Sequence, residues 1–128
     1  MAENLQKLLE EFLEEAGDKV IGTGIVDSDG KCEAYAIHGT FDKDYNVQRT
    51  ASTFAMIVNV LNKTLGGIYM KEDEVEEILV TSKSGFFFLE VLESERWFQG
   101  VTANKDSDID KIWQLMKKYK PLFQDQLK

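Results

Sequence analysis

The sequence predicts an α+β fold, a three-layer α/β/α sandwich in which a five-stranded antiparallel sheet has helices on both faces. Helix-like and strand-like segments follow one another in the order α-β-β-α-β-β-β-α. The connections between successive strands are short enough for antiparallel neighbours. In the strand-like segment 86–92 both alternating sets of residues are apolar, so neither face of the sheet can be left in water. These observations together predict the three layers.

The N-terminal part of the chain predicts one helix and one hairpin. Apolar residues recur at helical spacing over 5–13, with glutamates around the other side. Two strand-like runs follow, over 20–26 and 32–37. Asp29 and Gly30 lie between these runs, and such a pair is typical of a hairpin turn because the turn needs residues that tolerate positive φ.

The rest of the chain predicts a long helix, three strands and a final helix. Ser107 and Asp110 form an acidic version of the capping box, so the final helix is expected to start at Ser107. It is expected to end before Pro121, because proline cannot continue the hydrogen-bond ladder of a helix. The other expected elements are a helix over 42–65 and strands over 75–81, 86–92 and 96–102.

Length and composition predict one domain over residues 1–128, with a core of about 5–120 and a C-terminal tail at 121–128. Hydrophobic residues make up 43% of the chain and charged residues 30%, which is a globular composition. The net charge is 15 − 23 = −8, which disfavours binding to nucleic acid or to an anionic membrane. The apolar runs are too short for a membrane-spanning helix or a signal peptide, so we expect a cytoplasmic protein.

The second helix carries two apolar stripes, although one stripe is enough to seat a helix on its own sheet. One stripe consists of Val47, Ala51, Phe54, Val58, Leu61 and Leu65. The second stripe, roughly opposite, consists of Thr53, Met56, Ile57, Val60 and Thr64. A domain of this size has no further layer to cover the second stripe, so we predict a two-fold dimer through it. The alternative is that the C-terminal tail, with Leu122 and Phe123, folds back over this stripe.

The third strand follows the acidic run 72–77 and is expected to begin at an exposed edge of the sheet. Glu76 and Glu77 could block pairing with another chain at that edge. Alternatively, the strand pairs with its two-fold mate, which adds Ile78 and Val80 to the dimer interface.

Catalytic arrangements find little support in the sequence. The lone Cys32 and the lone His38 lie six residues apart on one strand, about 20 Å at 3.3 Å per residue, too far for a nucleophile and its base. Glu33 and Glu90 could form a buried carboxylate pair, but nothing nearby completes a site. We therefore predict no enzyme, no cofactor and no catalytic or metal-binding residue.

Trp97 and Tyr119 are the candidates for exposed binding anchors, because amphipathic aromatic side chains often carry interface energy. A different class of function is a small-molecule sensor of PAS or profilin-like shape. It would have a cavity under the strand Phe86–Phe88.

The order of elements resembles the roadblock/dynein light chain family, in a bacterial or archaeal type. The resemblance rests on hydrophobic and turn patterns at 25–30, 51–65, 78–80, 86–92, 98–102 and 109–116. It implies a homodimer or heterodimer in which the second helices pack together and the third strands pair. It also implies a non-catalytic scaffold or a regulator of a small Ras-like GTPase. Arg49 and Arg96 are the candidates if an arginine is inserted into such a partner.

Overall fold

The computed structural model describes residues 2–39, 45–93 and 96–127, and its elements follow the predicted order. Residues 42–44 of the expected second helix lie outside the described residues. The elements are α1 (Ala2–Ala16), β1 (Val20–Asp27), β2 (Cys32–Ile37), α2 (Val47–Ile68), β3 (Glu77–Thr81), β4 (Gly85–Glu93), β5 (Trp97–Asn104) and α3 (Ile109–Gln126).

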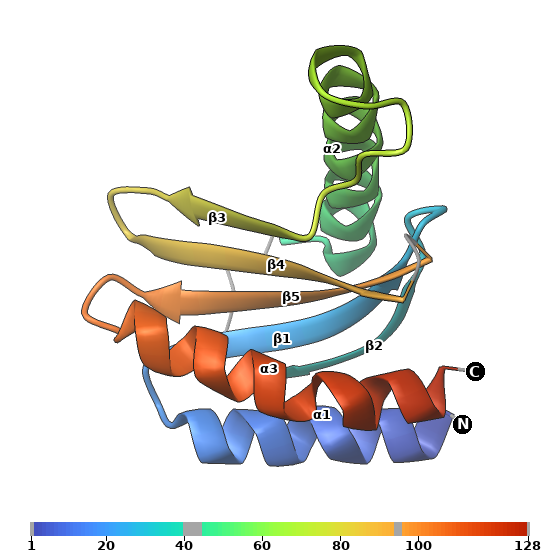
Figure 1. Cartoon of the computed structure of the whole chain (residues 1–128). Coiled ribbons are helices and arrows are strands. Elements are labelled where there is room, and N and C mark those ends of the chain that lie inside the picture. The colour runs from blue at the N-terminus through green and yellow to red at the C-terminus, as the bar shows by residue number, and fades with distance from the viewer. Residues whose placement is uncertain (1, 40–44, 94–95, 128) are drawn as a thin grey trace.

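The five strands form one antiparallel sheet in the order β2-β1-β5-β4-β3. Helices α1 and α3 lie side by side on one face of this sheet, and α2 lies on the other face (Figure 1). The predicted fold class, an α/β/α sandwich around a five-stranded antiparallel sheet, is therefore confirmed. Strands β2 and β3 are the two edges of the sheet, as the acidic run before β3 had indicated for that strand.

The main core lies between the sheet and the pair α1 and α3. Phe12 and Phe88 are fully buried there, and each makes an edge-to-face contact with an aromatic ring of α3. The ring centroids are 5.3 Å apart for Phe12 and Tyr119 and 5.0 Å apart for Phe88 and Trp113. Edge-to-face pairs of this kind contribute stabilisation beyond the burial of apolar area, so α1 and α3 pack stably on this face of the sheet.

The core under α2 is smaller. Ala55 and Val58 of the helix pack with Val75, Leu89 and Phe98, and partly buried side chains surround this cluster. Small residues at the contact let the helix approach the sheet closely, but they also limit the apolar area that the helix buries.

The C-terminal helix is longer than predicted. It begins after Asp108, whose side chain accepts a hydrogen bond from the backbone of Lys111, and not at Ser107. It then continues through Pro121 to Gln126, so the prediction of a helix that ends before Pro121 and of a tail at 121–128 is wrong. Phe123 is fully buried in the main core, and this burial outweighs the cost of about 3 kcal/mol of a proline inside a helix.

Candidate functional site

Polar contacts fix the position of α2 along one flank. Asn46 caps the helix by accepting a hydrogen bond from the backbone of Arg49, at 2.9 Å. The side chains of Gln48 and Ser52 donate hydrogen bonds to the carbonyl of Gly30, in the turn between β1 and β2. Gly30 has φ +89°, and a Cβ there would lie 2.8 Å from Cα of Ser52. Only glycine fits this contact, so the turn sets the position of the helix.

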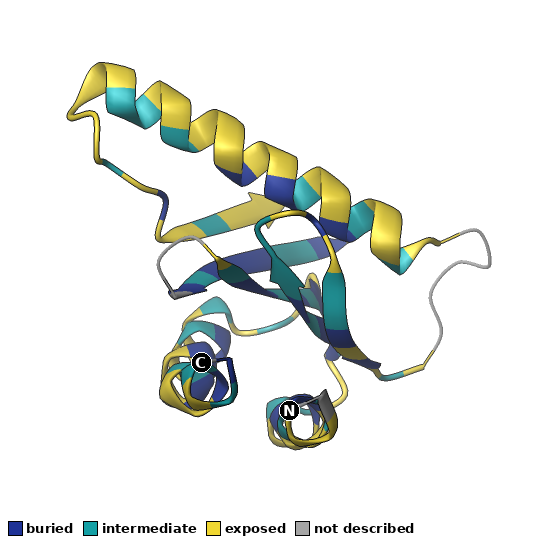
Figure 2. Cartoon of the chain, turned by 90° about the vertical axis from the view of Figure 1, so that its right-hand side faces the viewer, coloured by how far each residue is buried: buried dark blue, intermediate teal, exposed yellow. Residues whose placement is uncertain are grey.

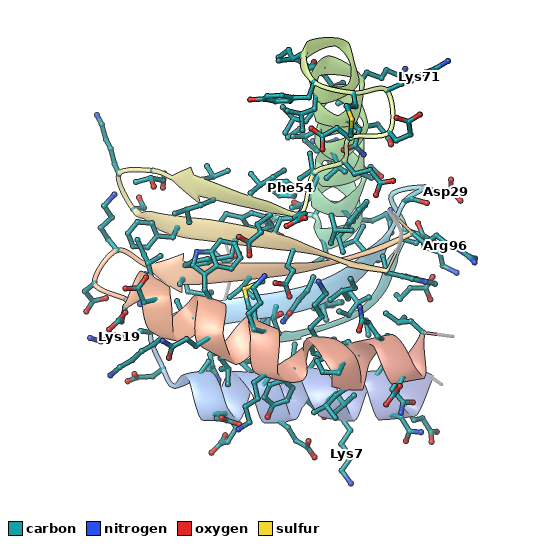
Figure 3. All side chains as sticks on the ribbon, in the orientation of Figure 1. Lys7, Lys19, Asp29, Phe54, Lys71 and Arg96 are labelled. Carbon is teal, nitrogen blue, oxygen red and sulfur yellow. The ribbon has the colours of Figure 1, made fainter. Side chains whose placement is uncertain are left out.

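A second polar contact fixes the C-terminal third of α2 beside the edge of the sheet. Asn62 accepts a hydrogen bond from the backbone N–H of Val75 at 2.6 Å, just before β3 begins. Beyond that level, the C-terminal part of α2 extends past β3 (Figure 1). Lys71, which follows the helix, lies at its far end from the sheet (Figure 3). The last turns of α2 therefore project beyond the edge strand of their own sheet.

The side of α2 that faces away from the sheet is exposed along its length (Figure 2). At about 100° per residue, the exposed apolar side chains fall into two groups. The outer stripe points away from the sheet and consists of Thr53, Met56 and Val60, with Met56 59% and Val60 56% exposed. The lateral stripe lies on the flank opposite to Gln48 and Ser52 and consists of Ile57, Leu61 and Thr64.

The two edges of the sheet differ in how their backbone groups are occupied. On β2, the carbonyl of Tyr35 accepts a hydrogen bond from Gln6, and the N–H of Cys32 donates one to Gln48. On β3, no side chain of the described residues bonds to the backbone of Glu77–Thr81. An edge with free backbone groups can pair with another strand, so β3 is the edge available to a second chain.

An apolar hollow lies between the N-terminal half of α2 and the sheet. Its cavity volume is about 70 Å³, and it is partly open to solvent. Gly22, Gly24 and Gly100 place no side chain in it, which lowers its floor. The rings of Phe54 and Phe87 stack at 4.0 Å between centroids and form one wall (Figure 3 labels Phe54). The hollow lies on the α2 side of β4, the strand under which the sensor hypothesis had placed a cavity.

Most of the predicted interface residues are exposed. The five side chains of α2, the outer stripe together with Ile57 and Thr64, are exposed, and so is Val80 of β3. Ile78 is different, because it is half-buried against the core under α2 and is not free for a partner. The alternative in which Leu122 and Phe123 cover the second stripe is wrong, since α3 lies on the opposite face of the sheet (Figure 1).

The four predicted partner-binding residues have different positions. Arg49 at the start of α2 and Arg96 in the turn before β5 are exposed. Trp97 is half-buried against the main core. The prediction of Tyr119 as an exposed anchor is wrong: it is buried in the main core, and its hydroxyl donates a hydrogen bond to Glu15 at 2.9 Å. Burial and this bond to the carboxylate raise the pKa of Tyr119 to about 12.

The suggested carboxylate pair does not form. Glu33 is on β2 and Glu90 on β4, with β1 and β5 between them, about 14 Å across the sheet. Burial raises the pKa of the Cys32 thiol, which lowers its reactivity. Within residues 2–39, 45–93 and 96–127, no group of three His, Cys, Asp or Glu side chains could hold a metal ion. None of the helices in these ranges is long and apolar enough to span a membrane.

Glu90 instead takes part in an ion-pair cluster that joins β3 to α3. Its side chain is fully buried, and Nζ of Lys117 donates hydrogen bonds to Glu90 and to Glu77, each at 2.6 Å. Burial acts to lower the pKa of Lys117, but the bonds to the two carboxylates outweigh it, so the pKa is raised. Lys117 compensates the charge of Glu77. This charge therefore opposes pairing of another strand with the β3 edge less than the sequence alone indicated.

Sequence reasoning missed two parts of this surface. Leu61 was assigned to the stripe on the sheet, but it is exposed on the lateral stripe. The helix was also expected to end at Leu65, so the exposed segment Ile68, Tyr69 and Met70 received no role. The signal for this segment was present as three consecutive large apolar residues just before the charged run at 71–77.

No protein-family model matches the sequence, and no curated protein matches it. Solved structures do match over nearly the whole chain. A roadblock/LC7 domain from Streptomyces avermitilis superposes with a TM-score of 0.69 at 17% identity, covering 91% of this chain and 95% of that one. At such an identity the similarity establishes the fold. The chain therefore has the roadblock fold, as the pattern of its elements predicted.

Among the structures with this fold, the chain is similar to MglB. For MglB of Myxococcus xanthus the TM-score is 0.84 at 14% identity, covering 98% of this chain and 89% of that chain. For the gliding protein MglB of Thermus thermophilus the TM-score is 0.81 at 15% identity, covering 97% and 88%.

Proposed function

We propose that this chain is a non-catalytic interaction module that forms a dimer through α2 and β3. The dimer binds a small Ras-like GTPase, either as a scaffold or as its regulator. The observation that carries the proposal is the surface just described, in which the lateral stripe of α2 lies beside an open sheet edge. The apolar side chains of this surface lie on one side of the molecule, and that side carries the features of an interface.

Pairing of β3 with a second copy of itself supports a two-fold assembly. Antiparallel pairing of two identical edge strands places a two-fold axis between them, so the same patch contacts itself. Two β3 strands would join the sheets into one, and the two α2 helices would lie antiparallel above it. Ile57 and Leu61 then lie between the helices, where their apolar area leaves water.

The outer stripe supports the second part of the proposal. Met56 and Val60 point away from the sheet, so they remain exposed after the lateral stripes pack together. A dimer would therefore present two outer stripes and two Arg49 side chains on one face. Proteins use exposed apolar side chains next to an arginine to bind other proteins. The Ras-like GTPase as partner comes from the resemblance to the roadblock family.

The test is capture of a partner from extract of the source cells, with either a non-hydrolysable GTP analogue or GDP added. We expect the wild-type chain to retain a small Ras-like GTPase, and retention to depend on the nucleotide. Met56→Glu should lose the GTPase and keep the dimer, because its change lies on the outer stripe.

The matched control is Lys7→Glu, since Lys7 extends from α1 on the opposite side of the sheet (Figure 3). This variant should retain the GTPase as the wild type does. Hydrolysis of GTP by the purified partner, with and without this chain, then separates regulation from scaffolding. If no GTPase is enriched by the wild type over Met56→Glu, the assignment of the partner is wrong.

A further inference from the structure

Two carboxylates lie directly opposite each other where the edge strand β3 begins. Glu77 of β3 pairs with Glu90 of β4 in the antiparallel register, so both side chains lie on the same face of the sheet. Like charges at such a pair repel each other and weaken the pairing of the two strands. Glu77 is also the only charged residue of the strand Glu77–Thr81. The start of the edge strand therefore depends on a cation that compensates this pair.

Lys117 of α3 supplies the cation. Its Nζ lies 2.6 Å from Oε2 of Glu77 and 2.6 Å from Oε2 of Glu90, so one ammonium group bridges the two strands. The other side-chain oxygen of Glu90, Oε1, is buried and accepts no hydrogen bond from the described residues. Within residues 2–39, 45–93 and 96–127, no other cation pairs with Glu90. The same ammonium group therefore compensates the buried carboxylate and fastens the edge strand.

The carboxylate of Glu77 borders the free edge of the sheet. Its side chain is 40% exposed, and β3 is an edge strand. A second strand that pairs with this edge removes water from Glu77. Burial of a carboxylate without a cation costs free energy, whereas a carboxylate that is already paired has its charge compensated. The ion pair with Lys117 therefore lowers the cost of pairing at this edge.

We infer that Lys117 is a positioning residue for the dimer, because it joins Glu77 to Glu90 and so keeps the β3 edge in place, with its charge compensated, for a second copy. This inference rests on the dimer proposed above and adds its control from α3. Lys117 lies on the face of the sheet opposite to α2, so it acts on the interface through β3 (Figure 1). The dimer therefore depends on the charge of a residue outside the lateral stripe and the outer stripe.

The test begins with a background variant that separates this role from the contribution of Lys117 to folding. Glu90→Gln removes the buried charge. Gln99, directly opposite on β5, has a side-chain oxygen without a donor, which offers an acceptor to the new amide. In this background Lys117 still pairs with Glu77, and its removal no longer leaves a buried charge uncompensated. The dimer dissociation constant of Glu90→Gln, measured by sedimentation equilibrium, should equal that of the wild type.

Lys117→Met is then added to the Glu90→Gln background. The dissociation constant should rise about 10-fold, because an uncompensated Glu77 loses water at two symmetric contacts. Addition of Glu77→Gln as a third change should restore the constant of the background. A merely structural role of Lys117 would not be relieved in this way, since the third change replaces none of the packing of the lysine.

Two further variants in the same background serve as controls. Lys118→Met removes the neighbouring exposed pair with Glu15 and should leave the dissociation constant unchanged. Lys117→Arg keeps a cation beside Glu77 and should leave it unchanged as well. Circular dichroism should show the same helix content in all variants. A rise in Lys117→Arg as large as that in Lys117→Met would overturn the inference, because charge would then not be the cause.

The outcomes separate the inference from the proposed function. A wild-type chain that remains a monomer overturns both. A dimer whose dissociation constant is the same in Lys117→Met and Lys118→Met overturns only the role of Lys117 and leaves the dimer in place. A rise in Lys117→Met that Glu77→Gln does not reverse overturns that role too, because the lysine would then act by another route than the edge strand.

Discussion

The two faces of the sheet differ in how completely the chain covers them. On the face of α1 and α3, aromatic rings interlock in the main core and Phe12, Phe88 and Phe123 are fully buried. On the face of α2, one helix covers part of the sheet, and Met56 and Val80 remain exposed. The chain thus covers one face of the sheet with two helices and leaves apolar side chains exposed on the other, and this difference is the basis of the proposed dimer.

The largest effect is expected when a large apolar side chain is truncated to alanine on each of the two faces. Phe123→Ala should lower the free energy of unfolding by about 3–5 kcal/mol, because it leaves a cavity in the main core. Met56→Ala should change it by less than about 0.5 kcal/mol, because that side chain is exposed. Urea unfolding measures both. A loss in Phe123→Ala as small as that in Met56→Ala would show that the C-terminal part of α3 does not belong to the core.

The next effect concerns two ion pairs made by α3, on the face of the sheet that α1 and α3 cover. Lys117→Met leaves the buried carboxylate of Glu90 without a cation and should cost about 3 kcal/mol. Lys118→Met removes the exposed pair with Glu15 and should cost less than about 1 kcal/mol. Equal losses in urea unfolding would show that the burial of Glu90 does not decide the energy of its pair.

The smallest effect is a dependence on pH that arises from Tyr119. Its pKa is raised from 10.0 to about 12 in the folded chain, so the unfolded chain loses the phenol proton first. This contribution to stability is complete below pH 10.0 and is lost as the pH rises toward about 12. Unfolding measured at about pH 9 and pH 11 should show a fall of about 1 kcal/mol that is absent in Tyr119→Phe. An identical fall in both proteins would assign it to other groups.

The order of elements and the three layers could be predicted because apolar periodicity reports local structure directly. The doubly apolar strand 86–92 required cover on both faces, and the structure has it. The path of α3 beyond Pro121 could not be predicted, since it depends on burial of Phe123 by distant residues. The prediction that Tyr119 is exposed failed for the same reason, because the hydrogen-bond partner of its hydroxyl, Glu15, is 104 residues away in sequence.

The candidate surface was predictable in part. A second apolar stripe on α2 follows from spacing alone, and its five residues are exposed as expected. The hollow was not predictable at its position, because it forms where glycines of β1 and β5 become neighbours across the sheet. The pairing of Gly24 with Gly100 depends on tertiary structure, so no local sequence pattern predicts it.

The most direct test of whether a second copy covers the α2 face is the mass of the protein in solution, measured by sedimentation equilibrium over a range of concentrations. We predict twice the 14.6 kDa of one chain for the wild type. Leu61→Glu, which places a charge on the lateral stripe, should give a folded species of 14.6 kDa. A wild-type mass of 14.6 kDa at every concentration would contradict the account.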